Sequence, residues 1–235
     1  MKVRVKFEKK GAMKFIGHLD MMRYFQKAIR RAGIDVAYSE GFSPHMIMSF
    51  AAPLGVGVTS SGEYFDMEVH TAMSTADFGR RFNAVMADGV RVLSVREIPD
   101  QKTSKAMSLV AAADYYVDFR EGRKPKQNHK DFISGFMAQS AIVVMKKTKR
   151  SEQETDIRPM IYRLELKEGR IFMQLASGSV HNLKPELVME AFYRYMGEEI
   201  TPYAWMVHRD EVYANIGDEQ HRKLVTLESL GKIIE

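Results

Sequence analysis

The residues best suited to binding chemistry gather early in the chain, in the stretch LDMMRYFQKAIRRAG. Four basic side chains recur there at helical spacing: Arg23, Lys27, Arg30 and Arg31. On a helix the first three share one face, and arginine offers a planar fork of donors that suits a phosphate group. The stripe therefore indicates a phosphate-binding face, although basic residues near a helix C-terminus also form ordinary solvated surfaces.

A short loop, GFSPH, follows this helix at residues 41–45. Gly41 permits a positive φ and Pro44 stiffens the chain, so the loop fixes the direction of its side chains. We expect Phe42 to be buried in the core, where it would plug a structural crossover.

Three side chains around this loop complete a candidate RNA-facing surface: Tyr38, Ser43 and His45. An aromatic ring beside basic groups supplies the stacking surface that single-stranded RNA sites use. We expect His45 to share one solvent-accessible cleft with the basic face of the helix. A purely structural role for His45 is an equally good interpretation.

A second basic segment, KKTKRSEQETDIRP, occupies residues 146–159. It adds Lys146, Lys147 and Arg158 as candidate contacts to phosphate, around a short acidic patch. A basic arm that touches phosphate and a plain exposed hairpin loop both account for this composition.

Catalytic and metal-binding patterns are weak in this sequence. Asp20, near the start of the basic helix, is expected to be its N-cap. His18, Asp20, His45 and Glu63 could surround a metal ion only if the loop folded back, and no HExxH pattern is present. The chain has no cysteine, which excludes thiolate zinc and iron–sulfur sites. We therefore predict neither a metal nor another cofactor.

The elements that position these residues form a repeated pattern. Apolar spacing in the first half predicts strands at 3–7, 47–52, 62–69 and 90–98 and helices at 19–32 and 75–86. The second half predicts strands at 114–120, 141–147, 158–167, 170–176 and 205–214 and helices at 130–139 and 185–196. We interpret both halves as the β-α-β-β-α-β order of a ferredoxin-like unit, with an additional short apolar piece at 13–16 in the first half and one strand more than this order needs in the second. We predict an α+β fold of two ferredoxin-like units in tandem, at 1–100 (with the GFSPH loop) and 110–235.

The composition is that of an ordinary globular protein, with 45% hydrophobic and 28% charged residues. No apolar run is long enough to span a bilayer, and the N-terminus lacks the apolar core of a signal peptide. We expect a cytoplasmic protein with no membrane partner. The net charge of +5 permits binding to nucleic acid but does not require it.

The long motif GHLDMMRYFQKAIRRAGIDVAYSEGFSPHMIMSFAAPLGVGVTSSGEYFDMEV resembles the signature of the radical-SAM-linked domain family of bacteria. The segments KTKRSEQETDIRPMIYRLEL and LKPELVMEAF resemble the second half of the same family. Domains of that family occur alone or fused behind a cobalamin-binding radical SAM module. Their genes often lie near those of a G-type ribonuclease and of ribosomal proteins. The resemblance therefore implies a radical SAM protein as a partner and points to RNA.

Three functions are compatible with these observations. We favour an RNA-binding accessory module, without chemistry of its own, that positions RNA for a partner enzyme such as a radical SAM protein. A metal-independent endoribonuclease is an alternative, because paired ferredoxin-like domains also occur in CRISPR repeat-processing enzymes. His18 or His45 would then be the acid/base, and Lys27 or Arg23 would hold the phosphate. The third function is a protein-interaction adaptor for a radical SAM enzyme.

Overall fold

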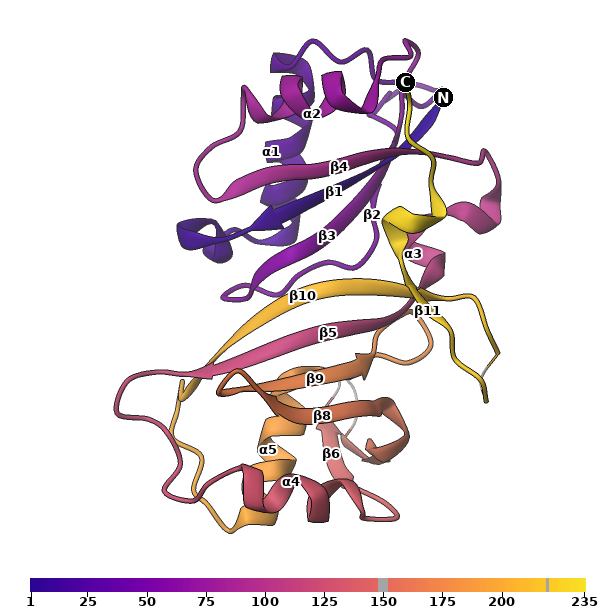
Figure 1. The fold of residues 1–235 in the computed structure, drawn as a ribbon. Helices are drawn as coiled ribbons and strands as arrows, with labels where there is room; N and C mark the ends of the chain where they lie inside the picture. Colours follow the sequence, from indigo (N-terminus) through magenta and orange to yellow (C-terminus); the bar gives the residue numbers. More distant parts are fainter. Residues whose placement is uncertain (148–151, 219) are drawn as a thin grey trace. The chain divides into compact units, whose positions relative to one another are not determined.

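The computed structural model describes residues 1–147, 152–218 and 220–235 (Figure 1). The chain divides into two compact units: Met1–Ala111 together with Arg209–Glu235, and Ala112–His208. The division near residue 111 falls close to the linker expected after residue 100. The last part of the chain, assigned to the second half by sequence, packs within the first unit. Both units combine helices with antiparallel strands, so the fold mixes α and β structure.

The first unit contains the predicted β-α-β-β-α-β order. Its main elements are β1 (Lys2–Lys9), α1 (His18–Arg31), β2 (Met48–Phe50), β3 (Thr59–Glu68), α2 (Thr75–Asn83) and β4 (Val90–Ile98). β1 lies between β3 and β4 and pairs antiparallel with both, while β2 pairs antiparallel with β3. The unit also holds η1 (Gly11–Phe15), η2 (Lys102–Ser104), α3 (Ala106–Leu109), the later part of β10 (Trp205–Asn215), β11 (Leu224–Thr226) and η4 (Leu227–Leu230).

The core of the first unit lies between this sheet and helices α1 and α2, which cover one face of the strands (Figure 1). Alternation along β1 places Val3, Val5 and Phe7 on that face, as the sequence predicts. The ring centroid of Phe7 lies 4.7 Å from that of Phe25 on α1 and 5.9 Å from that of Phe65 on β3. These aromatic contacts join the central strand to both of its neighbouring layers.

Helix α1 buries a slightly different face from the predicted one. Leu19, whose helical spacing from Phe25 and Ile29 predicts a place on the buried face, has 62% of its surface exposed. The buried residues of the helix are Met21, Phe25, Ala28 and Ile29. The difference is one of helical phase, because a residue two positions before Met21 projects to the opposite side of the helix.

The start of α1 also differs from the prediction. The helix begins at His18 with Gly17 as its N-cap, so Asp20 is not the cap. Asp20 lies in the first turn, where its negative charge interacts favourably with the helix dipole, and it accepts a hydrogen bond of 3.0 Å from Arg23. The sequence offers Ser74 or Thr75 as the N-cap of α2, and the Ser74 side chain does accept a backbone N–H of the first turn.

The face of β1 opposite the helices is covered, which contradicts the expectation of a half-buried strand. Arg4 has only 1% of its surface exposed. Its guanidinium donates to both carboxylate oxygens of Asp66, at 2.8 and 3.1 Å. It also donates to the backbone carbonyls of Ser104, at 2.6 Å, and Leu227, at 3.0 Å. Two segments distant in sequence therefore close over this face.

Lys6 makes a second set of contacts on the same face. Its ammonium donates to Glu211 on β10 at 2.6 Å and to Glu228 on η4 at 2.7 Å. Burial raises the pKa of Glu211, although the bond from Lys6 opposes the shift. Burial alone would lower the pKa of Lys6, but the bonds to both carboxylates outweigh it and the pKa is raised. The charged forms of all three groups thus depend on one another.

The second unit contains most of the remaining predicted elements. They are β5 (Val110–Phe119), α4 (Lys130–Met137), β6 (Val143–Lys147), β7 (Glu152–Asp156), η3 (Arg158–Met160), β8 (Ile161–Lys167), β9 (Arg170–Ala176) and α5 (Pro185–Met196). β9 lies between β5 and β8 and pairs antiparallel with both. The predicted hairpin turn is confirmed by positive φ angles at Glu168 and Gly169, 51° and 76°.

Strand β7 was not predicted. It pairs with β6 in a separate two-stranded ladder, so the predicted strand at 141–147 does not join the β8–β9 hairpin. The sequence of β7, EQETD, contains no apolar residue. This segment therefore lacks the alternating apolar residues that would predict a strand.

His129 lies among aromatic rings in the second unit. Its ring stacks on Phe119 with a centroid distance of 4.9 Å and lies 6.0 Å from the ring of Phe192. In the described part of the chain, its Nε2 is buried without a hydrogen-bond partner. Burial lowers the pKa of His129; Glu198 opposes this shift and Lys124 adds to it.

This lowered pKa predicts a loss of stability in mild acid. The unfolded chain takes up the proton near the ordinary histidine value of 6.5, whereas the folded chain takes it up only at lower pH. The free energy of unfolding should therefore fall as the pH decreases from 6.5 towards the folded pKa. His129→Phe keeps a ring in the stack and should flatten this part of the profile. Urea unfolding at a series of pH values measures it, and identical profiles for the two proteins would contradict the prediction.

Arg4→Met should lower the free energy of unfolding by about 3–5 kcal/mol, because it leaves the Asp66 carboxylate buried without its cation. The matched control is Lys2→Met, which removes a cation of the same strand from an exposed pair with Asp100. That change should lower the free energy of unfolding by about 0.5 kcal/mol or less. Urea unfolding of both variants tests this, and equal losses would show that burial of Arg4 is not what matters.

Candidate functional site

The basic face of α1 is exposed, as predicted. Arg23, Lys27 and Arg30 are all exposed and follow one another at helical spacing on the same side. Arg23 pairs with Asp20, but both side chains remain about two-thirds exposed, at 69% and 66%. Arg31 is exposed as well and donates to the carbonyl of Val85 at 3.2 Å. The three cations of the stripe are therefore accessible to an anionic ligand.

The GFSPH loop is closed at its base. Tyr38 and Met46 form an antiparallel bridge. One residue further in, the Ser39 N–H donates to the His45 carbonyl at 2.9 Å, and the His45 N–H donates to the Ser39 Oγ at 3.1 Å. The same Oγ lies 2.9 Å from Nδ1 of His45. The tip of the loop therefore projects from a base that is closed by these hydrogen bonds.

Phe42, at this tip, is fully exposed, so the prediction that it plugs the core is wrong. The closed base explains the difference, because the residues between Ser39 and His45 cannot turn back into the protein. Tyr38 is 43% exposed, and Ser43 and His45 are exposed too. The side chains that face solvent here are therefore those of Tyr38, Phe42, Ser43 and His45.

His45 lines a groove, but not the one predicted. The residues around this groove come from β1, from the loop before β2, from β2 and β3, and from the end of β4 and the segment after it, and none comes from α1. The structure thus places the basic stripe on α1 and places His45 beside a different set of side chains.

Only part of the second basic segment lies within the described residues. The side chains of Lys146 and Lys147 lie outside the described residues, as does the stretch 148–151. Arg158 is partly buried, and its guanidinium donates to the carbonyls of Met137, at 2.9 Å, and Ile161, at 3.2 Å. These bonds engage Arg158 with the backbone after α4 and at the start of β8.

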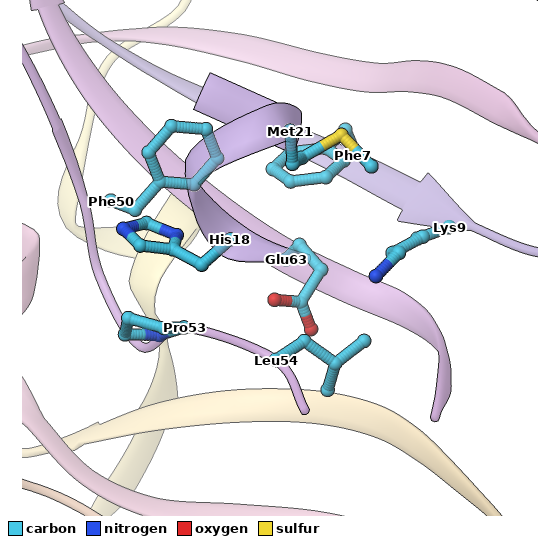
Figure 2. Close-up of a pocket in the computed structure, with 8 residues that line it drawn as sticks. All are labelled: Phe7, Lys9, His18, Met21, Phe50, Pro53, Leu54 and Glu63. Atoms are coloured by element: carbon cyan, nitrogen blue, oxygen red, sulfur yellow. The ribbon is translucent and has the colours of Figure 1, made fainter. Parts of the chain in front are cut away.

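Figure 2 shows a small cavity beside His18, on which the acid/base and metal hypotheses depended. Its volume is about 20 Å³, which is room for roughly one water molecule. The His18 ring stands edge-on to that of Phe50 at a centroid distance of 5.3 Å. Lys9 and Glu63 line the same cavity. No substrate fits into this space.

The charged groups of this cavity are committed to structural bonds. Glu63 pairs with Arg209, at 2.8 Å for the first of two bonds, and both side chains are buried. The Lys9 ammonium donates to the carbonyl of Ile16 at 2.6 Å. Burial lowers the pKa of Lys9; Glu63 opposes this shift and Arg209 adds to it. Within residues 1–147, 152–218 and 220–235, no group of three or more histidine, aspartate or glutamate side chains is placed to hold a metal ion.

The second unit has a cluster of cations that the sequence analysis missed. Three cations lie over two aromatic rings: Arg163, Lys167 and Arg170 over Tyr116 and Phe172. Strand pairing places all five on one face, with Tyr116 opposite Phe172 and Lys167 opposite Arg170. The signal was present in the sequence as alternation along β8, where Arg163 and Lys167 are two of the polar positions.

Acidic groups pair with these cations, which weakens the cluster as a phosphate site. Glu165 accepts from Arg163 at 2.7 Å, and Glu168 lies 3.5 Å from Arg170. The rings beneath are almost buried, with 7% of Tyr116 and 2% of Phe172 exposed. The arrangement therefore stabilises the sheet through cation–π contacts and leaves little free charge or ring surface for a ligand.

Comparison with known families places the chain in a group of bacterial proteins. The family model described as "Uncharacterized protein conserved in bacteria (DUF2344)" matches residues 2–185. The chain belongs to this family. No curated protein matches the sequence. Among the described residues, no helix is long and apolar enough to cross a membrane.

One similar solved structure is described as "Crystal Structure of a Cbf5-Nop10-Gar1 Complex". The identity is 10% and the TM-score 0.45, over 89% of this chain and 48% of the other. The chain thus spans about half the length of the chain it matches.

Proposed function

We propose that this protein is an RNA-binding accessory module that positions RNA for a partner enzyme. The observation that carries the proposal is the exposed stripe of Arg23, Lys27 and Arg30 on α1. Nearly all affinity for nucleic acid that is independent of sequence comes from such contacts to phosphate. The family resemblance adds a radical SAM protein as the partner, which remains part of the proposal.

The exposed loop supports the same function. Phe42 projects from a loop held by hydrogen bonds between Ser39 and His45, so its ring is presented in a defined direction. Bases of single-stranded RNA stack on such rings whatever their sequence. A basic helix and an aromatic loop in the same unit supply the two kinds of contact that single-stranded RNA requires.

The arrangement of the first unit favours a helix-side RNA site. We propose that each unit is ferredoxin-like, and the strand order β4-β1-β3-β2 with two helices on one face supports this for the first unit. Domains of this type commonly bind RNA on the open face of the sheet. Here Arg4 fixes the segments around Ser104 and Leu227 over that face. RNA therefore has to reach the helix side or the loop.

Removing the stripe should weaken RNA binding and its dependence on salt. We predict that Arg23→Ala/Lys27→Ala/Arg30→Ala lowers the slope of log K against log salt by about 2, since each lost contact to single-stranded RNA removes roughly 0.7. The measurement is filter binding of total cellular RNA at several salt concentrations.

A matched control removes three exposed arginines elsewhere in the same unit, in Arg80→Ala/Arg81→Ala/Arg91→Ala. Its salt slope should stay near that of the parent, and both variants should unfold at nearly the parent's urea concentration, because exposed charges contribute little to stability. Equal slopes for the stripe variant and the parent would rule out α1 as the RNA site.

Phe42→Ala should reduce affinity without changing the salt slope. Loss of one stacked base corresponds to about 1–3 kcal/mol of binding free energy, whereas the number of phosphate contacts stays the same. Phe42→Trp, which keeps a ring, should retain the affinity. The same filter-binding series tests both variants, and an unchanged affinity in Phe42→Ala would exclude stacking at the loop tip.

A further inference from the structure

A groove of about 260 Å³ lies in the first unit, next to the GFSPH loop. One side is formed by residues 45–49 and 66–68, and the other by residues between 98 and 107. The groove is much larger than the cavity beside His18. Its volume is near the lower end of the range for small-molecule sites, which begins at about 300 Å³.

The apolar part of the lining is rich in methionine: Met46, Met48, Met67 and Met107. Met46 and Met67 are buried and form fixed walls, while 53% of Met107 is exposed. Thioether sulfur is polarizable and packs favourably against aromatic rings. These walls therefore suit the flat face of a planar ring.

Three polar side chains in the lining make no bond to the rest of the described chain. Across the described chain, the Ser49 hydroxyl, the Gln101 amide and the Lys105 ammonium have no hydrogen bond or ion pair. The carboxylate of Asp66, by contrast, is neutralised by its two bonds from Arg4. The groove thus combines free donors and acceptors with an unpaired cation.

His45 adds a donor at the edge of the groove. The Ser39 Oγ accepts the backbone N–H of His45, so its own proton is available to Nδ1 of the same residue. When Nδ1 accepts, the neutral imidazole carries its hydrogen on Nε2. The ring then offers Nε2–H to a ligand in the groove.

Lys2, which also lines the groove, already has acidic neighbours. The bond to Asp100 raises the pKa of Lys2, and Glu68 adds to the shift. Lys2 is therefore held by acidic neighbours, and Lys105 is the cation that remains for an anion. A ligand that fits must carry one negative group close to a planar ring.

We propose that this groove binds one nucleotide of an RNA strand, with the base against the methionine side chains and the phosphate near Lys105 and His45. The inference rests on the proposed RNA-binding function and assigns a specific nucleotide site to it. Ser49 and Gln101 pair with the edge of the base, since a hydroxyl and an amide each supply both donors and acceptors. The volume admits a single nucleotide and excludes a stacked strand.

The methionine residues themselves report on binding. The full chain, labelled with ¹³C at its methionine methyl groups, is titrated with each of the four nucleoside 5′-monophosphates. The signals of Met48 and Met107 should shift because of the ring current of the base. Lys105→Glu should weaken binding roughly tenfold, because it removes and reverses a charge-assisted contact. Lys102→Glu makes the same charge change at an exposed position outside the groove and should alter binding less than about twofold.

Several outcomes would overturn the assignment. These are no methyl shift with any mononucleotide, equal shifts with inorganic phosphate alone, equal titrations of Lys105→Glu and Lys102→Glu, or shifts only with an extended apolar peptide. The α1 variant separates this inference from the proposed function, since mononucleotides should still bind to it. Methyl shifts in a protein that fails to bind cellular RNA would support the groove site and refute the proposed function.

Discussion

Two cations of β1 have to be neutralised away from water, and this requirement determines how the first unit is assembled. Arg4 is almost completely buried, and Lys6 has only 14% of its side chain exposed. A buried charge is tolerated only when it is paired and its hydrogen bonds are satisfied. Asp66 on β3 neutralises Arg4. The other partners come from late in the chain: the Leu227 carbonyl for Arg4, and Glu211 and Glu228 for Lys6. The division of the chain into units follows from this, because these contacts join Arg209–Glu235 to the N-terminal part.

The same contacts determine where a ligand can bind. Arg4 holds the carbonyl of Ser104, and Asp66 accepts the N–H of Ala106, so the segment that covers the sheet is fixed at two successive points. This removes the sheet face as a binding surface, but it also creates one wall of the groove beside Met107 and Lys105. The charged pairs thus stabilise the fold, and they also position the segment that forms one wall of the groove. Among the described residues, the exposed helix face and the groove are two surfaces that this packing leaves accessible.

Apolar spacing was sufficient to predict the order of the main helices and strands other than β7, because each spacing marks a face that has to be buried. It failed where burial depends on segments distant in sequence. Arg4 alternates with apolar residues, which predicts an exposed side chain, but it is buried. Phe42 is apolar, which predicts burial, but it lies at the tip of a loop whose base is closed by hydrogen bonds. Of the candidate site, exposure of the α1 stripe could be predicted, since Phe25 and Ile29 fix the opposite face. The groove could not, because its walls come from segments far apart in the chain.

The connectivity of the first unit constrains how it can form. Lys6 and Glu211 are separated in sequence by the whole of Ala112–His208, so their contact closes a very long loop. Loop-closure entropy rises only slowly with length, and a folded second unit would shorten the effective loop further. The entropic cost of closing this loop is therefore modest, but contacts between segments so distant in sequence form slowly. The segment that walls the groove is held by bonds within residues 1–111, from Arg4 to the Ser104 carbonyl and from the Ala106 N–H to Asp66. The groove can therefore form before the C-terminal segment docks, since none of its lining residues belongs to that segment.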